Sequence, residues 1–223
     1  MNLPEALAHH AHLSVFPDYA KLSRHAAHLI AATVRRQPEA VISLTTGHTM
    51  TGTYRLLVEL CRSGALDMTT TRLISSEEYV GVGPDDSISL FGWLRRELFE
   101  PCGVPPASVL RLVGDARDPA EECRRFDSAI EELGGIDLVV QSIGPNGHFG
   151  FNEPRSPRDA LSRMVDLDAS TRRSNISYWH DGARVPGRGL TMGVRTTLQA
   201  RHVLLLASGE KKAHALSRAL AGP

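Results

Sequence analysis

The chain has 223 residues, 42% of them hydrophobic, and its 25 basic side chains balance 25 acidic ones. That length suits one domain with a full hydrophobic core, and no Pro-rich or Ser/Gly-rich linker divides it. The balanced charge provides no broad positive field, so we expect neither nucleic acid nor an anionic membrane as a partner.

Short runs rich in Val, Ile and Leu alternate with longer amphipathic segments, which is typical of βαβ units around a mainly parallel sheet. In chain order we expect a strand at 13–16, a helix at 19–36, a strand at 40–44, a helix at 50–62, a strand at 72–75, a helix at 89–99, a strand at 109–112, a helix at 119–133, strands at 136–142, 163–167, 190–194 and 202–206, and a last helix from 210. The pattern predicts an α/β, Rossmann-like fold: an open, mainly parallel sheet flanked by helices in a single domain over 1–223.

Cysteine usage and hydropathy indicate the compartment. The three cysteines lie far apart without a CxxC pair, which is typical of a reducing environment, so we expect a cytoplasmic protein. No apolar run approaches the roughly 20 residues of a membrane span, and no signal-peptide pattern is present. His9, His10 and His12 lack carboxylate or cysteine partners at ligand spacing, so we favour a solvated face over a metal site.

The strand expected at 40–44 runs into Thr45-Thr46-Gly47-His48-Thr49 and then into a helix. Free backbone N–H groups and the positive helix end would converge at this turn, where an anion is stabilised. Gly47 to Gly52 has the GxxxxG spacing of a nucleotide P-loop, but Thr53 stands where that motif requires lysine, which excludes an NTPase. An ordinary strand-to-helix turn is the alternative.

A glycine-rich turn follows the strand expected at 136–142 and has the sequence Gly144-Pro145-Asn146-Gly147-His148-Phe149-Gly150-Phe151-Asn152-Glu153-Pro154. Open α/β sheets bind ligands at the carboxyl ends of their strands. There a neutral imidazole at His148 can accept a proton, and an imidazolium can return one. Asn146 can hold the ring by a hydrogen bond but cannot stabilise its charge.

Two further polar groups follow expected strands. Glu77 ends one strand and begins a polar turn, so we expect its carboxylate on the rim of a cleft; a solvated acidic turn formed with Glu78 is the alternative. Lys211 and Lys212 open the last helix, where cations oppose the helix dipole. A bound anion would remove that conflict, whereas two solvated lysines are the alternative. We expect Lys211 to face solvent.

Three of these segments, in the same order and spacing, resemble motifs of the glucosamine 6-phosphate deaminase family, which belongs with the 6-phosphogluconolactonases. The loop at 144–154 resembles its GxxxDGHxxFNEP motif, with Asn146 where the family usually has aspartate. The segment 44–49 resembles its phosphate-binding turn, with His48 in place of glycine. Segment 77–81 resembles its Asp-Glu-Tyr-Val-Gly turn, and segments 189–193 and 202–212 extend the resemblance over nearly the whole chain.

The resemblance implies conversion of glucosamine 6-phosphate, or a close relative, to a ketose 6-phosphate and ammonia, without a metal or organic cofactor. It implies that Glu77 is the base at carbon 2, that His148 opens the sugar ring, and that Glu153 and Asn146 orient the imidazole. It assigns the phosphate to Thr46, Gly47, His48, Thr49 and Lys212. Ser177 stands where the family has a phosphate-binding arginine, and Arg172 and Arg173 lie nearby.

Two alternatives stay open. One is an aldose–ketose isomerase or a lactonase acting on another sugar phosphate, although the Phe151-Asn152-Glu153-Pro154 run resembles the deaminases more than the lactonases. The other is a non-catalytic sugar-phosphate-binding regulator, because Asn146, Ser177 and His48 all depart from the family pattern. A homo-oligomer also stays open. Chains of the family normally continue into a further strand at the C-terminus, which is missing from the elements expected here.

Overall fold

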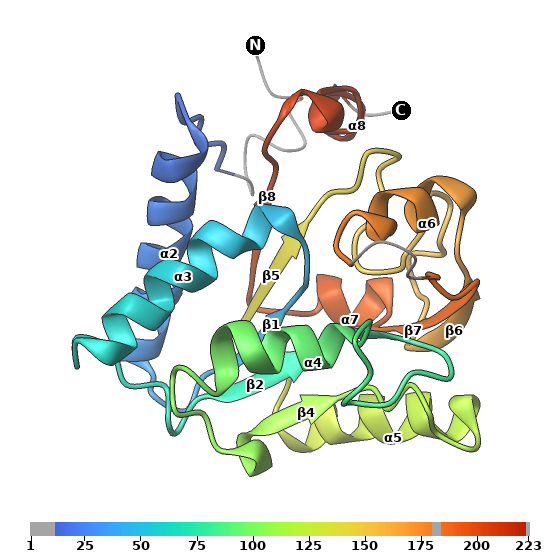
Figure 1. Ribbon diagram of the computed structural model, residues 1–223, viewed down its shortest axis with the longest axis horizontal. Helices are drawn as coiled ribbons and strands as arrows, with labels where there is room; N and C mark the ends of the chain where they lie inside the picture. The colour runs from blue at the N-terminus through green and yellow to red at the C-terminus, as the bar shows by residue number, and fades with distance from the viewer. Residues whose placement is uncertain (1–11, 180–183, 222–223) are drawn as a thin grey trace.

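The computed structural model describes residues 12–179 and 184–221. Its main sheet has five parallel strands in the order β4-β2-β1-β5-β8 (Figure 1). The strands are β1 (Val41–Leu44), β2 (Arg72–Ser75), β4 (Val109–Arg111), β5 (Leu138–Ser142) and β8 (His202–Leu206). This parallel sheet confirms the expected α/β fold. All five strands lie within a few residues of their predicted bounds.

A second, antiparallel sheet has the order β3-β7-β6 and consists of β3 (Glu77–Tyr79), β7 (Arg188–Thr191) and β6 (Arg163–Asp166). We did not predict β3. The strand expected at 190–194 is displaced: β7 ends at Thr191, and Gly193 caps the short helix α7 (Val194–Leu198). The strand expected at 13–16 is wrong, since residues 12–16 form no strand.

Helices cover both faces of the main sheet. Besides α7, the described helices are α2 (Tyr19–Arg36), α3 (His48–Arg62), α4 (Leu90–Leu94) with the π-helical turn η1 (Arg95–Phe99), the short η2 (Pro106–Ser108), α5 (Pro119–Glu132), α6 (Ala169–Ile176), η3 (Glu210–Lys212) and α8 (Ala213–Ala221). The start of α2 is set by Asp18, whose side chain accepts a hydrogen bond from the Lys21 N–H at 2.7 Å. Helix α3 begins at His48, two residues before the expected start.

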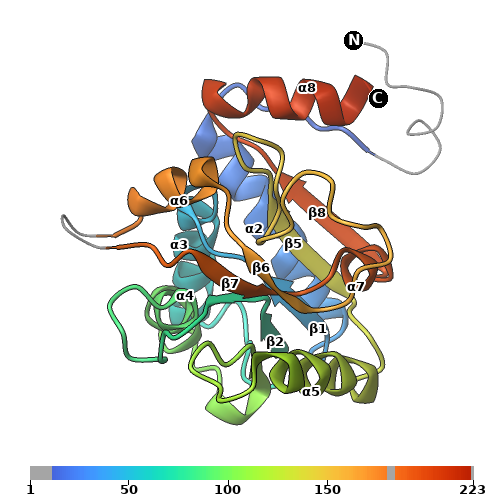
Figure 2. The ribbon, with the colours of Figure 1, turned by 90° about the vertical axis from the view of Figure 1, so that its right-hand side faces the viewer.

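Alternate residues of each central strand point to opposite faces of the sheet. Ile42 and Val140 pack on the side of α2 and α3, whereas Val41 and Val139 pack on the side of α5. Figure 2 shows these two helical layers from the side. Burial on both faces explains why the central strands have continuous apolar sequences.

The remaining expectations concern the membrane and the N-terminal histidines. Within 12–179 and 184–221, no helix combines the length and apolar character needed to cross a membrane. His9 and His10 lie outside the described residues.

Candidate active site

A cavity of about 380 Å³ lies at the carboxyl ends of β1 and β5. Five segments that are distant in sequence contribute to it: the turn before α3, the start of β3, the loop after β5, the end of α6, and η3. Of the residues predicted from sequence, the lining contains Thr46, His48, Thr49, Glu77, His148 and Lys212. Gly47, Asn146 and Glu153 do not line this cavity. Asn146 is hydrogen-bonded to the His148 ring, and Glu153 is hydrogen-bonded to Asn146.

The Glu77 carboxylate reaches the cavity from a more buried position than we expected. Glu77 is the first residue of β3, and the pairing of β3 with β7 leaves it 4% exposed. Its carboxylate accepts hydrogen bonds from the Thr45 hydroxyl at 2.5 Å, the Ser76 hydroxyl and the Thr46 N–H at 3.3 Å. Burial raises the pKa of Glu77, while these hydrogen bonds oppose the increase. A carboxylate with a raised pKa is a stronger base once ionised.

The neighbouring Glu78 is not part of a solvated acidic turn. Its carboxylate accepts hydrogen bonds from the Ser89 hydroxyl at 2.7 Å and from the N–H groups of Leu90 and Phe91 at 3.1 Å each. Glu78 therefore satisfies the first N–H groups of α4 and has a structural role.

The His148 imidazole is held in one tautomer by its neighbours. Its Nδ1 lies 2.7 Å from Asn146 Oδ1 and 3.0 Å from Thr171 Oγ1. Asn146 Nδ2 donates to Glu153 Oε2 at 2.9 Å, so the amide oxygen must be the atom that faces the ring. We assign the ring proton to Nδ1 from this network, because an amide oxygen only accepts. This leaves Nε2 free to accept a proton.

The charge state of His148 depends on burial and on Glu153. Burial lowers the pKa of His148, and the Glu153 carboxylate, 3.9 Å from Nδ1, opposes this effect. Lys212 also lowers the pKa. The imidazole is therefore neutral near pH 7 and can act as a base.

Gly144 allows the ring to lie against the backbone. A Cβ atom at Gly144 would lie 2.3 to 2.6 Å from atoms of the His148 ring. The Gly144 N–H also donates to the His148 carbonyl oxygen at 2.7 Å. The turn after β5 therefore needs glycine here for steric reasons.

Lys212 and the start of α3 form the cationic side of the cavity. Lys212 Nζ donates to Thr49 Oγ1 at 2.7 Å and to Ser142 Oγ at 2.6 Å, and burial lowers its pKa to about 8. Gly47, with φ 127°, caps α3, and the N–H groups of His48 and Thr49 at its start have no partner within the helix, whereas that of Met50 donates to the Gly47 carbonyl oxygen at 2.9 Å. This arrangement can hold an anion. Lys211 is exposed, as expected, at the edge of the cavity.

His48 and one of the arginines near Ser177 also line the cavity. His48 Nε2 lies 3.1 Å from the Ser177 carbonyl oxygen, and its ring packs edge-on against Tyr178. Arg173 lines the cavity, whereas Arg172 is not among the lining residues. The structure therefore makes Arg173, rather than Arg172, the arginine that could replace the one absent at Ser177.

Sequence reasoning missed the residues that hold the candidate groups in place. Thr45 and Ser76 are adjacent to predicted motifs, so their proximity to Glu77 could have been anticipated. Ser142 ends β5, and its hydroxyl accepts a hydrogen bond from Lys212, which is distant in sequence. Thr171 had no local signal, because only the position of α6 brings it to His148.

Comparison with known proteins identifies the family. The profile that describes glucosamine-6-phosphate isomerases and 6-phosphogluconolactonase matches residues 18–223. The chain belongs to this family. Its relatives include a glucosamine-6-phosphate deaminase of Bacillus pumilus (strain SAFR-032), 39% identical over 89% of this chain and 82% of the relative. Glucosamine-6-phosphate deaminase 1 of Bacillus subtilis (strain 168) is 36% identical over 92% of this chain and 84% of the relative.

Solved structures of the isomerase/lactonase family agree with this placement. A monomeric glucosamine-6-phosphate deaminase superposes with a TM-score of 0.88 at 36% identity, covering 92% of this chain and 86% of that one. The 6-phosphogluconolactonase of Trypanosoma brucei superposes at 0.66 with 19% identity, covering 92% and 84% of the two chains, and shows the shared fold alone.

Proposed function

We propose that the protein is a glucosamine-6-phosphate deaminase, which converts glucosamine 6-phosphate or a close relative to a ketose 6-phosphate and ammonia. One observation carries the proposal: the same cavity contains a buried carboxylate, an imidazole with a free Nε2, and a lysine beside a helix N-terminus. These are the groups needed to move protons at carbons 1 and 2 of a sugar held by its phosphate. The homology to deaminases over about nine-tenths of the chain supports this assignment.

His148 is assigned to ring opening. Nε2 accepts the proton of the anomeric hydroxyl, and the resulting imidazolium returns a proton to the ring oxygen as the C1–O5 bond breaks. Asn146 receives the Nδ1–H hydrogen bond throughout, so the ring keeps its orientation. Glu153 supports the imidazolium by its charge.

Glu77 is assigned to proton transfer between carbons. Its ionised carboxylate removes the proton from carbon 2 of the open-chain sugar, which gives an enolamine, and then delivers that proton to carbon 1. The amino group gives up the proton that the carbon 1 oxygen takes, so the carbon 2 amine becomes an imine and the carbon 1 aldehyde becomes a hydroxymethyl group. Water adds to that imine, and the C–N bond breaks to give the ketose and ammonia. The hydrogen bonds from Thr45 and Ser76 hold the carboxylate in place for this transfer.

The phosphate is assigned to Lys212, Thr49 and the residues Thr46, Gly47 and His48 at the start of α3. Arg173 supplies a second cation at the same cavity. A protein that binds through these groups should bind a phosphorylated sugar more tightly than the free sugar.

A panel of sugar phosphates tests the proposal. Purified protein is incubated with glucosamine 6-phosphate, other hexose 6-phosphates and 6-phosphogluconolactone, while ammonia, ketose and acid are measured. Release of ammonia and ketose in equal amounts from the amino sugar supports a deaminase. Ketose without ammonia would favour an isomerase, acid release a lactonase, and binding without turnover a regulator.

A further inference from the structure

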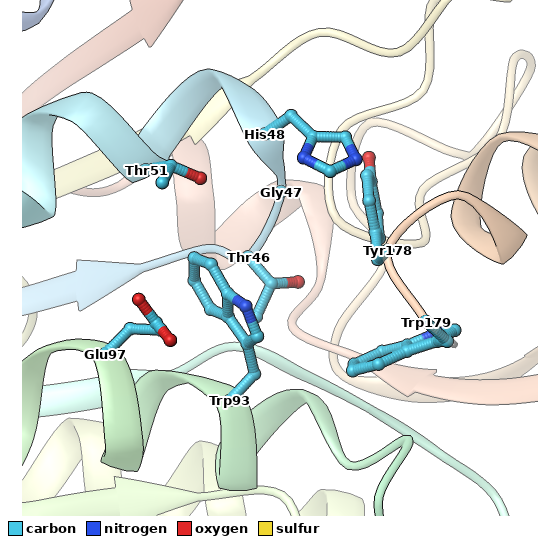
Figure 3. Close-up of a pocket in the computed structure, with 8 residues that line it drawn as sticks. All are labelled: Thr46, Gly47, His48, Thr51, Trp93, Glu97, Tyr178 and Trp179. Atoms are coloured by element: carbon cyan, nitrogen blue, oxygen red, sulfur yellow. The ribbon is translucent and has the colours of Figure 1, made fainter.

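A second cavity, here called the aromatic pocket, has a volume of about 240 Å³ (Figure 3). Its lining comprises Thr46, Gly47, His48, Thr51, Trp93, Glu97, Tyr178 and Trp179. It shares Thr46, His48 and Tyr178 with the candidate active site, so the two cavities are neighbours. Figure 3 shows Trp93 and Glu97 on the side of α4 and η1, and Tyr178 and Trp179 on the segment that follows α6.

The indoles of Trp93 and Trp179, the phenol of Tyr178 and the carboxylate of Glu97 dominate this lining. Trp93 and Trp179 are the two tryptophans of the whole chain. Within residues 12–179 and 184–221, the Glu97 carboxylate makes no ion pair. Among the described residues, the lining includes no lysine or arginine, and His48 Nε2 is engaged by the Ser177 carbonyl oxygen. The pocket shares the Thr46–His48 turn with the phosphate side of the active site, but on the walls formed by α4, η1 and the segment after α6 its carboxylate and indole rings suit a cation.

We propose that the aromatic pocket binds a protonated amine. Indole and phenol rings attract cations through their electron-rich faces, and indole is the strongest of them. The Glu97 carboxylate supplies the opposite charge, and the Thr51 hydroxyl supplies a further polar partner. The aromatic pocket thus has a negatively charged side chain in its lining, whereas the neighbouring cavity is lined by the cationic side chains of Lys212 and Arg173.

The size of the pocket limits the amine to a small one. Its volume of about 240 Å³ is below the roughly 300 to 1,000 Å³ typical of pockets for drug-sized ligands. Two sources fit this chemistry: an amino sugar without a phosphate, and the ammonium ion itself. An amino sugar would add stacking of its C–H face on the indole rings.

The location of both tryptophans provides a direct readout. Intrinsic tryptophan fluorescence is followed while glucosamine or ammonium chloride is added. Glucose is the neutral control, and potassium chloride is the ionic control. The active site is kept saturated with glucose 6-phosphate, so that a response cannot come from the neighbouring cavity. We expect saturable binding of glucosamine, ammonium or both, with at least a threefold weaker effect of glucose.

Variants test the role of the carboxylate. Glu97→Gln should weaken amine binding by roughly threefold or more, since it removes the charge and keeps the size. Glu131→Gln, at an exposed glutamate of α5, is the matched control and should bind as the parent does. Trp93→Phe leaves Trp179 as a single reporter and should retain a saturable signal.

The outcomes of these binding experiments distinguish the two candidate amines and can overturn the proposal. Binding of glucosamine alone identifies an amino-sugar site, and equal binding of ammonium identifies an ammonium site. Equal affinity for glucose, loss of the signal in glucose 6-phosphate, or unchanged binding in Glu97→Gln would each overturn it. Ammonia release from glucosamine 6-phosphate is measured separately, so failure here leaves the proposed reaction intact.

Discussion

Asn146→Asp tests the network that controls His148. The amide oxygen now accepts the Nδ1–H hydrogen bond at 2.7 Å, and the amide nitrogen donates to Glu153 at 2.9 Å. Aspartate would replace a neutral acceptor by a charged one at the same position. The variant should therefore stabilise the imidazolium and raise the pKa of His148.

The size of the shift follows from the added ion-pair attraction. The imidazolium already makes a charge-assisted hydrogen bond to the amide oxygen, and an opposite charge at the same position stabilises it further by on the order of 1.4 kcal/mol. That gain corresponds to about one pKa unit. The new carboxylate would also lie against Glu153, and a protonated ring beside the pair offsets the repulsion between the two carboxylates.

Two measurements check this shift. Long-range ¹H–¹⁵N spectra, assigned with His148→Gln, report the pKa and should show the Nδ1–H tautomer in the parent. Because Nε2 must be unprotonated to act as a base, the acidic limb of the kcat/KM profile should move to higher pH by the same amount. Asn146→Ala, which adds no charge, is the control. An unchanged or lowered pKa in the aspartate variant would refute this account of the network.

Three further predictions concern the carboxylate, the lysine and the turn. Glu77→Gln keeps size but removes proton transfer, so deuterium incorporation at carbon 2 in heavy water should fall roughly 10²-fold or more; normal exchange would place the base elsewhere. A bound phosphate should raise the pKa of Lys212 from about 8 toward 10.5, so binding near pH ~8.5 should take up protons. Calorimetry in buffers of different ionisation enthalpy measures this uptake, which Lys212→Met should abolish. Gly144→Ala should cost about 1 to 3 kcal/mol in urea unfolding because its Cβ overlaps the His148 ring, whereas Gly187→Ala, whose Cβ would have no atom of the described residues within 4 Å, should be neutral.

The candidate chemistry depends on a cavity that different parts of the fold build together. Glu77 comes from the small antiparallel sheet, His148 from the loop after β5, and Lys212 from η3. Substitutions that loosen the packing between the two sheets should therefore affect proton transfer more than phosphate binding, since Glu77 alone of these three lies in the second sheet.

The sequence by itself determined the main sheet and the segments that carry the chemistry. Local patterns are sufficient for these features, because a central parallel strand must be apolar on both faces and a helix must begin where its N–H groups find a cap. The order of the Thr45–Thr49 turn, the Glu77 turn and the 144–154 loop likewise predicted that their side chains would meet at the carboxyl edge of the sheet.

Only the tertiary structure decided how those side chains are held. β3 has three residues, and its pairing with the distant β7 is what buries Glu77 and raises its pKa. Thr171 reaches His148 because α6 packs over the loop, and Asn146 separates Glu153 from the ring by bonding to both. Such contacts depend on the three-dimensional placement of segments that are far apart in the chain, which a local pattern does not encode.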